Sequence, residues 1–332
     1  MDGCIEVAVN AKVEEAHSAF GITIIGPYAA EFATPRTNRL IMSPGRSKFV
    51  DLTQIRKTAI AAMFSNDQLM KDFVLKGGNA LNLVYQFGSR SSIDVDLSME
   101  GDIENLDLVK LRVFSALRGR FDHLGYVLFD ESFVARPRFP TGEHGEEWGG
   151  YEVQFKIIEK SHFRLLGENL ERIRRNATVV SPLQKRTFKI QISKFEYCAG
   201  RVERQVDDCT IYVYTPAMLC IEKLRALCQQ MPEYPLVRHK RARARDFYDI
   251  HCIITEGTVN IGTDSNLELA RNIFAAKRVP LNLIPRIRDY REFHRQDWGA
   301  VQDSVSGEVQ AFDFYFDFVI RQLPMLKALW KE

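Results

Sequence analysis

The stretch "VLKGGNALNLVYQFGSRSSIDVDLSM", residues 74–99, constrains the fold of this chain more than any other. Its short apolar run predicts a buried strand that ends at Gly77 and Gly78. The segment "GNALNLVYQF" then repeats its apolar side chains at helical spacing, and "IDVDLSM" alternates as a strand does. The stretch therefore predicts a strand, a glycine turn, a helix and a second strand in immediate succession.

The second of these strands places two carboxylates together. Residues i and i+2 of a strand point to one face, so Asp94 and Asp96 project together while Ile93, Val95 and Leu97 face the core. Two carboxylates this close repel each other unless a cation lies between them. Mg²⁺ is typically held by one or two carboxylates together with substrate phosphates. The pair therefore predicts a metal site for Mg²⁺, with room for two ions.

The two glycines lie where the chain passes from strand to helix. Glycine lets backbone N–H groups approach a phosphate, and the start of a helix favours negative charge. Lys76, before the glycines, and the turn "SRSSID", which contains Ser92, add phosphate-binding groups. An Asp-x-Asp pair by itself is more often a solvated strand face. Its combination with Gly77 and Gly78 at this spacing favours a cradle for a triphosphate and Mg²⁺.

The rest of the chain is predicted to form three parts. Residues 1–49 are an N-terminal arm or a small irregular subdomain, and residues 50–215 mix strands with helices. Residues 216–332 are expected to be helical throughout, starting at Pro216 with Thr215 as the cap. The fold class is therefore α+β, with a mixed sheet flanked by helices and followed by an all-helical C-terminal domain.

Composition narrows the function only slightly. The formal net charge is +2, which neither requires nor excludes a nucleic-acid partner. The six cysteines are scattered without zinc spacing, as is usual for buried thiols in a reducing compartment. The N-terminus lacks the features of a signal peptide, and no apolar run approaches the roughly 20 residues of a membrane helix. We expect a cytoplasmic protein with no membrane partner.

The opening stretch resembles the signature of the abortive-infection nucleotidyltransferase toxins, the AbiEii/AbiGii and MenT-like family of the polymerase-β-type nucleotidyltransferase superfamily. The family pattern is K-G-G-T-A-L, then an arginine and a serine ahead of D-[IV]-D-L-S, and here Asn79 replaces the threonine. The resemblance implies a polymerase-β-type nucleotidyltransferase domain that binds an NTP. It also implies that Asp94 and Asp96 hold Mg²⁺, that Ser92 contacts a phosphate and that Lys76 lines the nucleotide pocket.

A second motif of that family is a helical lysine, followed on the next helix by a basic residue and D-x-x-D. Lys223 fits the lysine, and Arg245, Asp246 and Asp249 fit the second element. Asp246 and Asp249 are neighbours on one helix face. By resemblance, Lys223 and Asp246 are catalytic, and Arg245 and Asp249 bind the nucleotide. Alternatively, Asp249 supports the basic cluster structurally.

The basic stretch "RHKRARAR", residues 238–245, has two interpretations. Such a run is commonly a solvated helix face, but in a nucleotidyltransferase it also suits nucleotide phosphates or an RNA backbone. We expect a helix with Arg238, Arg241 and Arg245 on one side.

One position departs from the family pattern. Polymerase-β-type enzymes commonly use a third carboxylate on a later strand, where the toxin family has K-[IL]-[DE]-[IV]. Here Lys189 is followed by Gln191. A neutral amide neither accepts a proton as a base nor matches a carboxylate as a metal ligand. Glu152 and Glu196 are alternative acids, and their spacing does not decide between them.

The sequence thus predicts a Mg²⁺-dependent nucleotidyltransferase that transfers NMP from an NTP to an acceptor hydroxyl. By resemblance, the acceptor is the 3′ end of a tRNA, and the protein is the toxin of a toxin–antitoxin (abortive infection) system with a cognate antitoxin. Two alternatives stay open. The site could modify a small molecule such as an aminoglycoside, or the protein could be a non-catalytic nucleotide- or RNA-binding module.

Overall fold

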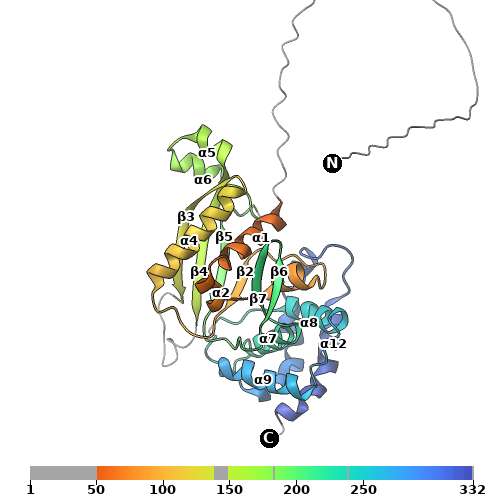
Figure 1. Ribbon diagram of the computed structural model, residues 1–332. Coiled ribbons are helices and arrows are strands. Elements are labelled where there is room, and N and C mark those ends of the chain that lie inside the picture. The colour runs from red at the N-terminus through yellow and green to blue at the C-terminus, as the bar shows by residue number, and fades with distance from the viewer. Residues whose placement is uncertain (1–50, 138–148, 182–183, 238, 331–332) are drawn as a thin grey trace, which may run out of the picture. The chain divides into compact units, whose positions relative to one another are not determined.

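The computed structural model describes residues 51–137, 149–181, 184–237 and 239–330, shown in colour in Figure 1. These residues belong to one compact unit. The predicted N-terminal arm, residues 1–49, lies outside the described residues. The division of the remaining chain between residues 215 and 216 stays a prediction.

A mixed seven-stranded sheet forms the centre of the described chain, as the sequence predicts. Its strand order is β3-β4-β5-β2-β1-β7-β6, and β2 pairs antiparallel with β1 and parallel with β5. The strands are β1 (Val74–Lys76), β2 (Val95–Ser98), β3 (Tyr126–Arg136), β4 (Gly150–Glu159), β5 (Phe188–Ser193), β6 (Val202–Val206) and β7 (Cys209–Val213). The two strands of the opening stretch are thus direct neighbours near the middle of the sheet.

The helices between the strands follow the periodicity with some interruptions. Asp51 caps α1 by accepting from two backbone N–H groups, but a second cap at Asn66 divides the expected long helix in two. The helix after the glycines begins at Gly77 and continues as a π-helix, η1. These helices are α1 (Leu52–Met63), α2 (Asp67–Asp72), α3 (Gly77–Asn79), η1 (Ala80–Tyr85), α4 (Leu106–His123), α5 (Lys160–Leu166) and α6 (Leu170–Arg175).

Helices α1 and α4 lie side by side across one face of the sheet (Figure 1). Val95 and Leu97 of β2 are fully buried, whereas Asp96 between them points to the opposite face. Strand β2 begins one residue after Asp94, and Ile93, which was expected in the core, is half-buried. The acidic face of the strand is therefore the one that these two helices leave open.

From Thr215 onward the described chain contains helices and one isolated β-bridge between Arg90 and Val305. Thr215 caps α7 by accepting from the N–H of Met218 at 3.2 Å, as expected. These helices are α7 (Pro216–Cys228), α8 (Ala244–Glu256), α9 (Asp264–Ala276), the 3-10 helix η2 (Leu281–Tyr290), α10 (Arg291–Arg295), α11 (Trp298–Gln302), α12 (Phe312–Gln322) and the 3-10 helix η3 (Leu323–Leu329). The predicted all-helical C-terminal region is confirmed.

The predicted basic helix over residues 238–245 is wrong. Helix α8 begins only at Ala244, and residues 239–243 are not helical, so Arg241 and Arg245 do not share a helix face. Arg238 lies outside the described residues.

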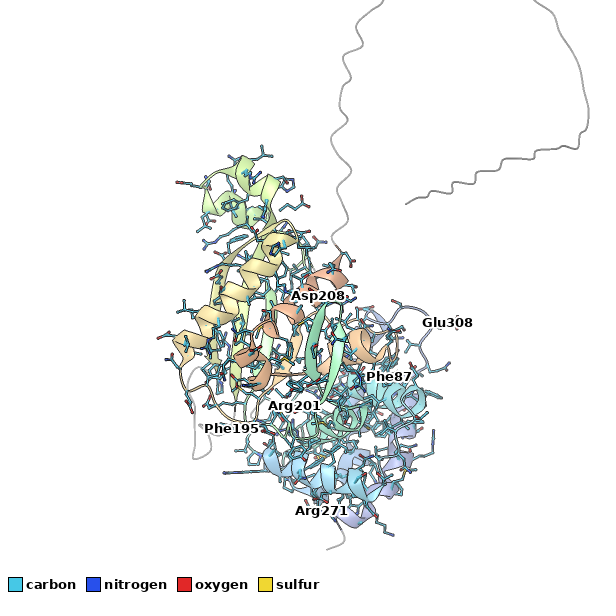
Figure 2. The ribbon with its side chains drawn as sticks, in the orientation of Figure 1. Phe87, Phe195, Arg201, Asp208, Arg271 and Glu308 are labelled. Atoms are coloured by element: carbon cyan, nitrogen blue, oxygen red, sulfur yellow. The ribbon has the colours of Figure 1, made fainter. Side chains whose placement is uncertain are left out.

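The segment after η1 packs against the C-terminal helices. Phe87, which Figure 2 labels, lies so close to the end of α8 that a Cβ on Gly257 would come within 2.8 Å of its ring. The N–H of Gly88 donates to the Glu256 carboxylate at 2.9 Å. The opening stretch is therefore held between the sheet and the helical region. Across the described chain, no helix is both long and apolar enough to span a membrane.

Candidate active site

One row of side chains crosses the open face of the sheet. Asp96 on β2 pairs with Lys76 on β1 and with Gln191 on β5, and Gln191 pairs in turn with Glu152 on β4. Because registered residues on neighbouring strands point to the same face, these four side chains lie on one surface. The predicted aspartate thus stands between the predicted lysine and the position where an acid was missing.

The electrostatics of the aspartate pair fit a cation. Partial burial raises the pKa of Asp94, against the opposing influence of Lys189. Burial likewise raises the pKa of Asp96, and the charge of Asp94 raises it further, while Lys76 and Arg245 lower it. Two carboxylates that are costly to ionise, and that repel each other, gain from a divalent ion held between their oxygens. Such hard oxygen ligands match Mg²⁺.

The two glycines make room for the functional side chains beside them. Gly77 has a φ of +69°, and a Cβ there would lie 2.5 Å from Oδ2 of Asp96. A Cβ on Gly78 would lie 2.6 Å from Cβ of Ser92. The Ser92 hydroxyl is 3.5 Å from the backbone oxygen of Asp94, to which it donates. The glycine turn, the serine and the aspartates therefore form one packed unit.

Two residues that the sequence analysis did not assign hold this unit in place. The side-chain amide of Asn79 donates to the backbone oxygen of Asp94 at 2.7 Å. Arg56, which is 8% exposed on α1, donates to the backbone oxygen of Ser92 at 2.7 Å and to Oδ1 of Asn79 at 3.4 Å. In the sequence, the only indication of this contact is an arginine, Arg56, among the apolar residues of the segment that forms α1.

The second motif forms a buried ion cluster between α7 and α8. Nζ of Lys223 lies 2.6 Å from Oδ2 of Asp249 and 3.1 Å from Oδ1 of Asp246, and all three side chains are buried. Burial opposes the lysine charge, but the two carboxylates outweigh it and raise the pKa of Lys223. Despite burial, Arg243 and Lys223 hold the pKa of Asp246 below its ordinary value. The lysine is thus charged and held in place by the two aspartates.

Arg90 joins the two halves of the site. This residue comes from the turn before β2, and its guanidinium donates to both oxygens of Asp249, at 2.9 and 2.8 Å. A paired fork of this kind fixes orientation as well as charge. Asp249 is therefore shared between Arg90 and Lys223, neither of which belongs to the basic stretch 238–245 that it was expected to support.

Arg245 of α8 adjoins Asp246 in the chain and affects the aspartate pair by its charge. Its charge lowers the pKa of Asp94, of Asp96 and of Asp246, so it is near all three carboxylates. Its side chain is exposed, unlike those of Lys223 and Asp249. The structure thus brings both predicted motifs into one region and leaves this arginine accessible to a ligand.

Lys76 belongs to a buried ion network. Its Nζ lies 3.2 Å from Glu196 and 3.6 Å from Glu222 of α7. Glu196 also pairs with Arg225 at 2.6 Å, and despite its burial these cations hold its pKa far below the ordinary range. Glu196 is therefore unsuited to accept a proton.

A cavity of about 340 Å³ opens beside this network. The residues that line it include Lys76, Glu152, Gln191, Glu222, Arg243 and Lys277. Asp94 and Asp96 do not line the cavity, but Lys76 and Gln191, which flank Asp96 in the sheet, do.

The remaining candidate acid, Glu152, is engaged with cations. Its Oε1 accepts from Arg136 at 2.6 Å and from Gln154 at 2.7 Å, and its Oε2 lies 3.4 Å from Nζ of Lys189. Gln191 beside it is exposed. Within the described ranges, no cluster of three His, Cys, Asp or Glu side chains is arranged to hold a metal ion. The site therefore offers two carboxylates for a metal, with the other ligands to come from a substrate or water.

Comparison with known proteins finds a family match over most of the chain. A family model described as "Nucleotidyl transferase AbiEii toxin, Type IV TA system" matches residues 58–318, which include both motifs. No curated protein sequence matches the chain.

Among solved structures, the chain is similar to MenT4, the nucleotidyltransferase toxin Rv2826c from Mycobacterium tuberculosis H37Rv. The identity is 15% and the TM-score 0.43, over 84% of this chain and 83% of that one. It is also similar to an antigenic nucleotidyltransferase-like protein from Paracoccidioides brasiliensis. There the identity is 14% and the TM-score 0.34, over 67% of this chain and 92% of that one.

Proposed function

We propose a reaction from the premise that this chain belongs to the AbiEii family of nucleotidyltransferase toxins of type IV toxin–antitoxin systems. The reaction is the Mg²⁺-dependent transfer of a nucleoside monophosphate from an NTP to the hydroxyl at the 3′ end of a tRNA. The observation that carries this proposal is the close packing of the glycine turn against Asp96 and Ser92 on the open face of the sheet, with the exposed Arg245 of α8 acting on the same aspartates by its charge.

Different residues of the site would bind the metal ion, bind the phosphates and hold the helices in place. Asp94 and Asp96 would hold Mg²⁺, which supplies charge neutralisation at the phosphates when bound. The backbone at Gly77 approaches the phosphates, and the exposed guanidinium of Arg245 pairs with their charge. Lys223 of α7 holds α8 in place through Asp246 and Asp249, and its positive charge lies behind the phosphates.

The transfer exchanges one phosphorus–oxygen bond for another. The acceptor oxygen bonds to the α-phosphorus while the bond to the bridging oxygen breaks, pyrophosphate leaves, and the hydroxyl proton passes to water. Positioning and charge stabilisation account for most of such catalysis. The cavity beside Asp96 has room for one nucleoside, since ligand cavities begin at roughly 300 Å³.

The family also implies a cognate antitoxin, and a tRNA acceptor places the protein in the cytoplasm. Among the described residues, the cavity is lined by five basic and three acidic side chains, and this excess of positive charge suits a polyanion better than a polycationic aminoglycoside.

An assay with labelled NTPs tests this proposal. The parent protein would be incubated with each NTP, Mg²⁺ and either total tRNA or an aminoglycoside, alongside Asp94→Ala and Lys223→Met. We expect label on tRNA, and a loss of about 100-fold or more in both variants, because electrostatic groups at such sites contribute this much. Asp107→Ala is the matched control, since Asp107 is exposed on α4, away from the site.

Three outcomes would contradict the proposal. Unchanged labelling by Asp94→Ala would mean that the site lies elsewhere. Label on the aminoglycoside alone would make the substrate a small molecule. Binding of NTP without release of pyrophosphate would make the protein a binding module.

A further inference from the structure

The position opposite Asp96 holds an amide where a second metal ion would need a carboxylate. Gln191 pairs directly with Asp96 across β2 and β5, and its side chain is exposed. A side-chain amide binds a divalent cation more weakly than a carboxylate does, because it carries no charge. The β5 side of the site therefore lacks the ligand that would bring a second ion close to the pair.

A lysine occupies this side instead. Val95 pairs with Ile190 in parallel register, so Asp94 and Lys189, which each precede that pair, adjoin each other on the same face. The Lys189 ammonium thus lies beside the aspartate pair on the side away from the glycine turn.

Glu152 holds this lysine in place. Its Oε2 lies 3.4 Å from Nζ of Lys189, while its Oε1 is occupied by Arg136 and Gln154. Both oxygens of Glu152 therefore already have partners. Burial raises the pKa of Glu152, but its hydrogen-bond partners and the nearby cations lower it by more. The carboxylate therefore stays charged beside the lysine. The Glu152 carboxylate therefore positions Lys189 and is not free to bind a metal ion.

In-line geometry places the acceptor hydroxyl on the β5 side of the aspartate pair. In phosphoryl transfer, the attacking and leaving oxygens lie roughly in line on opposite sides of the phosphorus. In the proposed function the leaving pyrophosphate lies at the glycine turn, on the β1 side of Asp96. The acceptor oxygen must then approach from the β5 side, where Lys189 lies.

We propose that the site uses one metal ion, bound by Asp94 and Asp96, and that Lys189, positioned by Glu152, provides the positive charge at the acceptor oxygen. This inference rests on the proposed nucleotidyl transfer. As the new bond forms and the bond to pyrophosphate breaks, the hydroxyl proton leaves to water, and the ammonium of Lys189 stabilises the negative charge that develops on the oxygen.

Counting bound ions tests the first half of the inference without any turnover. Mn²⁺ binding is measured by electron paramagnetic resonance in the presence of the α,β-methylene analogue of each NTP. We expect one ion per chain for the parent, and two for the double variant Lys189→Met/Gln191→Glu, which restores an acid and removes the competing charge. Lys156→Met is the matched control with one ion, since Lys156 is paired with Asp130 on β3. Two ions in the parent would overturn the inference.

Transfer rates test the second half. Lys189→Met is expected to lower the transfer rate by about 100-fold while the affinity for the Mn²⁺-bound analogue stays within about twofold, because the charge acts at the acceptor. Lys189→Arg, which keeps the charge, should recover at least about a tenth of the parent rate. Equal rates for Lys189→Met and the parent would overturn the inference.

The two proposals fail in different ways. If the parent transfers no nucleotide to any acceptor, the proposed function fails. If the parent transfers nucleotide and Asp94→Ala does not, but the parent binds two ions, only the one-ion inference fails.

Discussion

Gly77 shows how closely single residues are fitted at this site. Its φ of +69°, and the 2.5 Å that would separate a Cβ at this position from Oδ2 of Asp96, leave no place for a side chain. For Gly77→Ala we expect a loss of about 1–2 kcal/mol in the free energy of unfolding from the left-handed backbone alone. Displacement of Asp96 should also weaken Mn²⁺ binding. Urea unfolding and Mn²⁺ titration measure the two effects.

The control for this prediction is Gly119→Ala. Gly119 lies within α4, and a Cβ there would meet nothing within 4 Å. Alanine in a helix is favoured over glycine by about 1 kcal/mol, so the control should be neutral or more stable. A Gly77→Ala protein as stable as Gly119→Ala, with unchanged Mn²⁺ affinity, would show that the tight fit at Asp96 is relieved by a small movement.

At the scale of elements, one carboxylate ties the turn before β2 to α7 and α8. Asp249 pairs with Arg90 at 2.8 Å and with Lys223 at 2.6 Å, and all three are shielded from water. Asp249→Asn leaves both cations short of a counter-charge, so we expect a loss of about 3 kcal/mol in the free energy of unfolding. Chemical denaturation at neutral pH measures it.

Asp207→Asn is the matched comparison, because Asp207 pairs with Lys57 at a similar 2.7 Å but in an exposed position. An exposed ion pair contributes less than about 1 kcal/mol. Similar losses in the two variants would mean that burial does not set the strength of the Asp249 pairs.

The same scale shows what the sequence could predict. Periodicity identified β1 and β2 and the glycine turn because strand alternation and backbone freedom are local properties. The start of α8 was mispredicted because it depends on distant partners. The N–H of Ala244 donates to Asp297 at 2.8 Å, and that of Arg243 donates to His294 at 3.2 Å, across more than 50 residues. The sequence around residue 244 therefore does not show where the helix starts.

The same limit applies to the candidate site. Spacing predicted the aspartate pair and the shared helix face of Asp246 and Asp249, whereas the link to Lys223 came from the resemblance to the family. The contact between Glu152 and Lys189 could not, because it depends on β4 lying next to β5 in the sheet. Strand order is a long-range property. The sequence shows that Gln191 stands where the family has an acid, but only the fold shows that Lys189 and Glu152 lie beside it.

At the scale of the whole molecule, buried charges connect the sheet to the helical region. Lys76 on β1 reaches Glu222 on α7, and Arg90 reaches α8. Loss of the helical region would leave these cations without those partners, at a cost that no surface pair could offset. We therefore expect conditions that unfold one of the two regions to destabilise the other.

His294 gives this shared stability a dependence on pH. The ring is fully buried on α10 against Phe247, and its Nδ1 accepts from the N–H of Arg243. Burial lowers the pKa of His294 to about 4, with Arg243 acting in the same direction and Asp246 opposing. In the unfolded chain the pKa is the ordinary 6.5. Between these values the unfolded state binds a proton that the folded state does not, so stability falls as pH falls.

From pH 7 to pH 5, His294 should cost the folded protein about 2 kcal/mol in the free energy of unfolding, and the effect should level off below about pH 4. His294→Gln keeps a hydrogen-bond acceptor for Arg243 but cannot titrate. We therefore expect the variant to lose about 2 kcal/mol less than the parent over this interval, whatever its stability at pH 7. Urea unfolding of both proteins at pH 5, 6 and 7 measures the difference.

His123→Gln, a change at an exposed histidine on α4, is the control and should follow the parent. Parallel pH profiles for His294→Gln and the parent would show that this histidine accepts a proton in the folded state.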